Sequence, residues 1–509
     1  MKKPAKIGLW LLFFAVLGVL ALWLEHERAK ARLAAFKADL IAKGEKLAIA
    51  DHVPKLPPAV SNAAPDFIAA ANRLTELKAE WQLARMRMVA PGKARVTWRQ
   101  QELPTEKEPD LWPFIVAHVE DNRPLLAEMA AALGRPEIVF NLDYTKGFNL
   151  LLPHVDKHKR AVSVMANATL ADLHDEQTAS AFTNLLAAVR FVRLNEEPLL
   201  ISQLVRVACG QIALGATWEG LQSVGWREAE LRKLQSEWEG WDMKRGWLAA
   251  MHMDRAMGVD TFAQCRGNPE MMRLLNGMGA GGPSSSGGSF FDDLINNPGR
   301  AGERALGFGV SIGWTLWFSY DDERWALNWH LAWLGGARQA HQSDSNALPF
   351  ARMDAAAKPF ETPPTTHIIS RLMLPSLGNM QKNFAHYEAV RRLTVTAIAL
   401  HRHRLKHGQF PASLGALVPE FLAEVPRDFM DGQPLRYRLE ADGQFRLWSV
   451  GEDFKDDGGD ATTVGAHSTN PFDWLKGRDW IWPQAASEAE VAAYHAELEA
   501  KRASTPPKR

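Results

Sequence analysis

The most constraining feature of this chain is an uncharged apolar run, IGLWLLFFAVLGVLALWL, which covers Ile7–Leu24 after the basic start MKKPAK. At a rise of 1.5 Å per residue, these eighteen residues form a helix of roughly 27 Å, which is enough to cross the hydrocarbon core of a bilayer. Trp10 and Trp23 lie near its two ends, where indole rings are favoured at membrane interfaces. A cleaved signal peptide, the alternative, usually has a shorter apolar region of about 7–15 residues and a small-x-small site, which this run lacks. The sequence therefore predicts an uncleaved transmembrane helix over residues 7–24.

The orientation of this helix follows from the basic residues that flank it, because they are enriched on the cytoplasmic side of membranes. A short N-terminal tail, residues 1–6, carries Lys2, Lys3 and Lys6. Basic residues on the far side weaken the asymmetry: Arg28, Lys30, Arg32 and Lys37. We expect a cytoplasmic N-terminus, a single span in the inner membrane and a periplasmic or extracytoplasmic body. No later run reaches spanning length, and LGFGVSIGWTLWFS (Leu306–Ser319), which is shorter and glycine-rich, is expected to be buried core.

The composition excludes several classes of protein. The 509 residues contain 59 Lys and Arg against 59 Asp and Glu, so no basic field recruits nucleic acid. The only two cysteines, Cys209 and Cys265, form no CxxC pair, which excludes a zinc finger and a disulfide framework. One disulfide between them and two separate buried thiols are both open at this stage.

The chain divides into segments of different composition. After the span, residues 25–65 are expected to form a helix-prone stalk and a proline-containing linker. Residues 66–380 are predicted to be a helical domain, since runs such as Ala168–Asn195 and Pro198–Val224 repeat apolar residues every three or four positions. A Gly/Ser-rich loop at 277–289 interrupts this domain. Residues 381–485 change to an α+β pattern, and residues 486–509 form a tail. The predicted fold is therefore mainly α, with a small C-terminal α+β module.

Within that module, a helix from about Phe384 to Lys406 is predicted to end at His407-Gly408. Two strand-like runs, LRYRLE (Leu435–Glu440) and QFRLWSV (Gln444–Val450), flank Ala-Asp-Gly. Glycine at the end of a three-residue connection supplies the positive φ that such a hairpin needs. The sequence therefore predicts a β-hairpin.

An acidic loop, SVGEDFKDDGGD, follows the second strand from Ser449 to Asp460. Calcium takes 6–8 oxygen ligands in irregular geometry, and glycines allow a loop to wrap around the ion. The predicted calcium ligands are Ser449, Asp453, Asp456, Asp457 and Asp460. The spacing of an EF-hand is absent, and a solvated loop whose carboxylates point apart is the alternative.

Other motifs give weaker signals. His403 and His407 have the i, i+4 spacing of metal ligands, but Arg404 stands where a zinc protease needs glutamate, which favours a solvated helix end. Trp325, Trp329 and Trp333 share one helical stripe and are expected to pack in the core. No P-loop, no G-x-S-x-G motif and no clear general acid and base pair is found.

The block from about Tyr387 to Trp482 resembles the C-terminal module of the major pseudopilin of type II secretion systems. The resemblance rests on HRLKHGQFPASLGALVPEFL, VPRDFMDGQPLRYR, FRLWSVGEDFKDDGGD and RDWIWP. Large envelope proteins of planctomycete and verrucomicrobial type carry a similar module. The resemblance implies a small sheet fixed by a calcium loop, with Ser449, Asp453 and a later aspartate as ligands, Asp479 being a further possibility. The chain departs from the family in having no prepilin glutamate inside its apolar run.

These features together predict a membrane-anchored, non-enzymatic envelope protein with a calcium-stabilised pseudopilin-like module. We expect a scaffolding or interaction role linked to type II secretion or a pilus-like machine, with the membrane and other envelope proteins as partners and no nucleic acid. An envelope-acting hydrolase with its site in the helical domain is the alternative, and a true pseudopilin variant is a third possibility.

Overall fold

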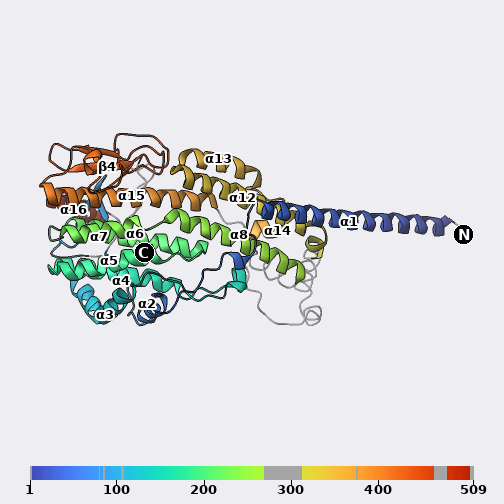
Figure 1. The fold of residues 1–509 in the computed structure, drawn as a ribbon, viewed down its shortest axis with the longest axis horizontal. Coiled ribbons are helices and arrows are strands. Elements are labelled where there is room, and N and C mark those ends of the chain that lie inside the picture. The colour runs from blue at the N-terminus through green and yellow to red at the C-terminus, as the bar shows by residue number, and fades with distance from the viewer. Residues whose placement is uncertain are drawn as a thin grey trace.

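The computed structural model describes residues 3–78, 81–83, 86–104, 108–268, 312–373, 377–462 and 478–504. Helices account for 62% of the structure and strands for 6%, which confirms the mainly helical prediction with a small C-terminal sheet. The helices stack into an elongated body from which one long helix projects (Figure 1). The predicted Gly/Ser-rich loop at 277–289 lies outside the described residues.

The projecting helix is α1, which runs unbroken over Lys3–Ala42. The apolar run is therefore helical and continues directly into the segment predicted as a stalk. Ala29, Leu33 and Leu40 in this second half are buried, and Leu33 and Leu40 pack with Leu327 of α12. Residues 29–40 are thus part of the packed body, whereas the apolar half before them leaves it.

The first part of the body is a helical bundle, preceded by a short turn and a short helix. These elements are η1 (Ile49–Asp51), α2 (Ala64–Ala71), α3 (Trp112–Ala132), η3 (Tyr144–Asn149), α4 (Val155–His174), α5 (Thr178–Leu194), α6 (Leu200–Leu221), α7 (Glu228–Glu239) and α8 (Met243–Gly267). The helix α4 is buried at every position from Ala161 to Leu173, because α5 and α6 both pack on it. The 3–4 spacing read in the sequence therefore marks the faces that meet in this bundle.

One described helix, α6, is long and apolar enough to cross a membrane by length and composition alone. More than half of its most apolar window is buried inside the body. It also carries buried polar side chains such as Arg206 and Glu219, so α6 is a core helix of the bundle. The predicted span over residues 7–24 includes residues whose side chains lie outside the description, and it stays a prediction.

The second part of the body covers one face of the bundle. It contains η4 (Trp314–Phe318), α12 (Ser319–Ser343), α13 (Ala347–Ala357), η5 (Lys358–Phe360), α14 (Ile368–Met373), α15 (Leu377–His407) and η6 (Leu414–Leu417). Trp329 and Trp333 are buried in the core, as the stripe predicts, and Trp325 is half-buried.

The prediction of buried core over residues 306–319 is wrong for half of the eight residues described there. Trp314 is buried, but Ile312, Leu316, Trp317 and Phe318 are exposed. Glycine content and short length carry no information on which side of a turn faces solvent.

The predicted hairpin is confirmed. Strands β3 (Arg436–Leu439) and β4 (Phe445–Ser449) pair antiparallel, with Arg436 opposite Trp448, and β5 (Trp480–Ile481) adds a third strand beside β4. Gly443 has φ +77° in the connection, as expected. The predicted helix before it, α15, also ends at His407, where Gly408 has φ +79°. This sheet lies at the opposite end of the body from the projecting end of α1 (Figure 1).

A second small sheet was not predicted. Strands β1 (Arg87–Ala90) and β2 (Lys93–Arg95) form a hairpin, and β6 (Gln484–Ala485) pairs parallel to β2. The Trp218 indole N–H also donates to the Pro483 carbonyl at 2.8 Å. The last helix, α16 (Glu488–Ser504), follows β6 and contacts β1. One hydrophobic core consequently runs from Ala63 to Trp482, across the predicted boundary at residue 380.

The two cysteines are free and buried in different helices, Cys209 in α6 and Cys265 in α8. Of the two possibilities left open by the sequence, the structure shows separate thiols. Burial raises the pKa of Cys209 to about 12 and that of Cys265 to about 11.

Candidate functional site

The acidic loop begins where β4 ends, and glycines shape its backbone. Gly451 has φ +71°, and a Cβ at this position would lie 2.4 Å from the Arg478 carbonyl oxygen. Gly458 and Gly459 follow with φ +73° and +81°. Only glycine adopts this conformation readily and allows so close a backbone approach, so these residues fold the loop back against residue 478.

The carboxylate of Asp479, the residue directly before β5, holds this loop. It is buried and accepts backbone N–H groups of Gly459 at 2.7 Å and of Asp457 and Asp460 at 3.3 Å each. Burial raises the pKa of Asp479, while these N–H groups oppose the rise. The loop backbone therefore converges on one buried carboxylate, whereas the sequence analysis predicted that it converges on a cation. Asp479 was named in the sequence only as a further possibility, because it follows the loop by nineteen residues.

A second buried aspartate, Asp428, organises the base of the loop. Its two oxygens accept the Ser449 hydroxyl at 2.8 Å and the Val450 N–H at 2.9 Å. Arg436 lies 3.4 Å from the same carboxylate, and burial raises the pKa of Asp428 against its hydrogen bonds. Sequence reasoning did not assign a role to Asp428 or Arg436. The sequence around an aspartate in a turn or an arginine in a strand is the same whether the side chain faces solvent or pairs with the other residue.

The five predicted ligands have different surroundings. Ser449 donates to Asp428, and Asp456 accepts the Trp448 indole N–H at 3.0 Å and pairs with Arg436 at 3.3 Å. Asp460 accepts the hydroxyl of Thr462 at 2.6 Å. The Asp453 carboxylate accepts only a local N–H, from Lys455, and the Asp457 carboxylate has no hydrogen bond or ion pair within the described part of the chain.

Together these side chains do not form a ready-made metal site. Among the described residues, no group of three or more His, Cys, Asp or Glu side chains is arranged to hold a metal ion. Calcium binding would therefore require Asp453 and Asp457, the two least engaged carboxylates, to turn toward a shared point. The calcium site stays a prediction.

The histidine pair on α15 has an ordinary structural environment. The rings of His403 and His407 lie 4.4 Å apart, and both pack on Phe421. His403 Nδ1 hydrogen bonds with the Gln409 carbonyl at 2.9 Å. The pair therefore packs the end of α15 onto the following turn, in agreement with the interpretation as a helix end.

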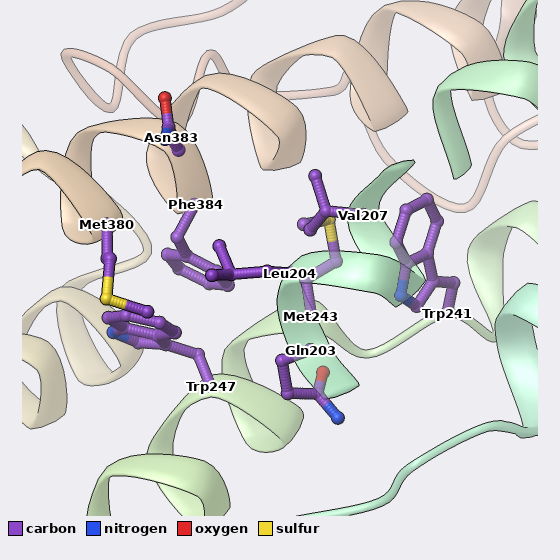
Figure 2. Close-up of a pocket in the computed structure, with 9 residues that line it drawn as sticks. All are labelled: Gln203, Leu204, Val207, Trp241, Met243, Trp247, Met380, Asn383 and Phe384. Carbon is purple, nitrogen blue, oxygen red and sulfur yellow. The ribbon is translucent and has the colours of Figure 1, made fainter. Parts of the chain in front are cut away.

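A small apolar cavity lies between α6, α8 and α15 (Figure 2). Trp247 and Phe384 stack at 5.7 Å on one side of it and Trp241 lies on the other (Figure 2). Its volume of about 20 Å³ is close to that of one water molecule. Small-molecule sites typically need about 300–1,000 Å³, so this cavity is a packing gap.

A larger cleft of about 590 Å³ lies between the end of α15, the β3–β4 connection and the β2–β6 strands. Its carboxylates are Asp442 and Glu490, and the Lys93 ammonium together with Ser487 lowers the pKa of Glu490 to about 2. Its guanidinium groups, Arg99 and Arg404, pair with no carboxylate within the described ranges. The cleft thus offers two guanidinium groups beside a carboxylate, Glu490, whose pKa is lowered.

Carboxylates with raised pKa values lie elsewhere and are structural. Glu219 is fully buried, burial raises its pKa to about 7, and both its oxygens accept the Thr97 N–H. Asp322 is buried and accepts the Trp314 indole N–H at 2.8 Å and the Ile369 N–H at 3.0 Å. Each of these groups holds a neighbouring segment in place, and neither lines the small cavity or the larger cleft described above.

Comparisons of this chain with protein-family models, with curated proteins and with solved structures found no match.

Proposed function

We propose that this chain is a single-span envelope protein whose helical body works as a scaffold or interaction platform outside the cytoplasmic membrane. The observation that carries the proposal is the surface of α1 between Phe13 and Leu24. Eight apolar side chains there are exposed: Phe13, Phe14, Val16, Leu17, Leu20, Leu22, Trp23 and Leu24.

An exposed apolar surface of this kind is costly in water. Phe14 is 63% exposed and Trp23 is 56% exposed, on the helix that projects from the body (Figure 1). Soluble proteins bury such surface, at about 25 cal/mol per Å², whereas a bilayer removes it from water without any protein partner. The continuation of the same helix into the packed segment from Ala29 would couple the anchor rigidly to the body.

The opposite end of the body carries the β3-β4-β5 sheet and the acidic loop. A scaffold anchored through α1 would present this module far from the lipid surface, where partners in the envelope could reach it. This arrangement suits the predicted link to a type II secretion or pilus-like machine.

The proposal is tested by comparing the full chain with a version that begins at residue 25. The full chain should stay in the membrane fraction after an alkaline carbonate wash, and the truncated chain should be soluble and folded. As a matched pair, Leu17→Arg should weaken membrane retention, because a charge at the centre of a span costs about 3 kcal/mol. Val224→Arg, at an exposed apolar residue of the body, should not. A truncated chain that remains in washed membranes would refute the anchor.

A further inference from the structure

Four exposed apolar side chains gather beside the base of α1. One is Ile312, and the other three lie in η4: Leu316, Trp317 and Phe318. We call these four residues the junction patch. Leu316 and Trp317 are 45% and 43% exposed, and three members of the patch are consecutive in sequence. A patch of this composition on a water-facing surface calls for an occupant.

The junction patch is held in a fixed orientation by Trp314, which lies between Ile312 and Leu316 in the sequence. Trp314, in the same π-helical turn, points inward, is buried and donates its indole N–H to Asp322. That carboxylate is itself held by the backbone N–H groups of Ile369 and Ser370, at 3.0 and 3.2 Å. The outward direction of Leu316 and Trp317 is therefore set by the packed interior.

The patch lies at the level of α1 where the apolar run ends. His26 Nδ1 hydrogen bonds with the Leu316 carbonyl, and the His26 ring meets Tyr320 edge to face at 5.2 Å. His26 comes two residues after Leu24, which corresponds to roughly 3 Å along a helix. The exposed apolar surface of α1 and the junction patch are thus neighbouring surfaces at one end of the body.

Charge appears on the other side of this level. Arg32 of α1 lies 3.6 Å from Asp321, and further along the helix Lys37 pairs with Glu323. Along α1, the order is therefore exposed apolar surface, then the junction patch, then ion pairs with the body. Tryptophan is enriched where a membrane protein passes from lipid to water, and Trp317 lies at such a transition.

We propose that the junction patch enters the headgroup and acyl boundary of the bilayer that α1 crosses, with Trp317 and Leu316 as the inserted side chains. This inference rests on the proposed anchor and extends it. One helix alone leaves the body free to tilt, whereas a second contact beside the helix fixes the angle of the body to the membrane. The distal sheet is then held at a defined height above the lipid.

The test uses an environment-sensitive dye (NBD) on single introduced cysteines in the full chain, reconstituted in phosphatidylcholine nanodiscs. Cys209 and Cys265 are buried and their thiol pKa values are raised, so they should label little at neutral pH. Leu17→Cys reports on the anchor, Leu316→Cys on the junction patch, and Val224→Cys on an exposed apolar site of the body that is 93% exposed. A lipid carrying a spin label near its headgroup serves as the quencher.

We expect blue-shifted emission for the dye at positions 17 and 316, quenching by the shallow spin label that is strongest at 316, and water-like emission at 224. If position 17 reports lipid and position 316 reports water, the junction patch proposal is wrong and the anchor stands. Blue-shifted emission at 316 without lipid quenching would show burial against protein and would also overturn it. Water-like emission at position 17 would instead refute the proposed function itself. Trp317→Asp, an exposed substitution, should abolish the lipid signal at 316 without changing the unfolding midpoint.

Discussion

The apolar half of α1 and the core helix α6 are similar in composition and opposite in surroundings. Both are long helices rich in leucine and other aliphatic residues, and α6 satisfies the length and apolarity of a membrane span. However, α6 is packed among α4, α5 and α8, whereas α1 exposes eight apolar side chains between Phe13 and Leu24. An apolar composition shows only that a helix is disfavoured in water. The burial of its side chains shows whether they are removed from water by packing against protein or would need another apolar medium.

The polar residues of the two helices add to this contrast. The run Ile7–Leu24 contains no charged residue, and α6 contains Arg206 and Glu219, both fully buried and hydrogen bonded inside the body. A buried ionisable group is tolerated where hydrogen-bonding partners surround it, and a folded core can supply these partners whereas lipid chains cannot. The following predictions use these residues to test the difference.

The largest expected effect comes from Arg206→Ala. Arg206 donates to the Val192 and Arg193 carbonyls at 2.7 and 2.8 Å, near the C-terminal end of α5. Its loss leaves two carbonyl groups without these donors in the interior, so we expect a loss of about 3–5 kcal/mol in unfolding free energy. Denaturant titration of the full chain in detergent measures it. Leu17→Ala is the control and should change the free energy by less than about 0.5 kcal/mol, because Leu17 packs against no core. A loss below 1 kcal/mol for Arg206→Ala would place α6 outside the cooperative core.

A somewhat smaller effect is expected from Glu219→Gln, and it depends on pH. Burial raises the pKa of Glu219 to about 7, so the native state keeps a proton that the unfolded chain releases near pH 4.5. The contribution of Glu219 to stability is therefore complete below pH 4.5 and decreases as the pH rises to about 7, by about 3 kcal/mol. The Gln variant should lack this decrease and gain stability relative to the parent chain at pH 8 compared with pH 4.5. Exposed Glu102→Gln is the control. Parallel pH profiles for the parent and Glu219→Gln would contradict the assignment.

The acidic loop offers a similar comparison between a buried and an exposed aspartate, Asp479 and Asp453. Asp479 is buried and accepts three backbone N–H groups, whereas Asp453 is exposed and accepts one local N–H. An Asn at 479 keeps one acceptor and turns an amide donor toward the remaining N–H groups. We expect Asp479→Asn to cost about 2 kcal/mol and Asp453→Asn less than about 0.5 kcal/mol, by denaturant titration. Equal effects would mean that the loop is not held by Asp479.

The smallest expected effect is that of calcium on the same loop. If the cation binds only the folded loop, a concentration ten times its dissociation constant adds about 1.4 kcal/mol. The calcium prediction expects a higher thermal midpoint in millimolar calcium than in chelator, and loss of this gain in a chain carrying Asp453→Asn and Asp457→Asn. Identical midpoints for the parent chain would remove calcium and leave Asp479 and Arg436 to stabilise the loop.

The parts of the fold predicted from sequence are those with strong local signals. The β3–β4 hairpin followed from two strand-like runs around Ala-Asp-Gly, and the end of α15 from His407-Gly408. The β2–β6 pairing was missed because strands of three and two residues, nearly 400 positions apart, have no periodicity to detect. Only the tertiary fold brings them together.

The candidate site shows the same limit. The acidic loop was located from its composition, but its supporting residues, Asp428 and Arg436, carry no local mark of burial. The junction patch was misassigned because a π-helical turn with Trp314 inside and Trp317 outside reads, in sequence, as uniformly apolar. Which side faces the core depends on Phe262 of α8 and Ile369 of α14, which pack with Trp314 and are remote in sequence.

The most direct test of the account is protease digestion of spheroplasts that express the full chain. Because α1 is assigned as the anchor and α6 as core, protease added outside should degrade the body from residue 25 onward while a cytoplasmic marker stays intact. A body that remains protected until the spheroplasts are lysed would contradict both the topology and the role of α1.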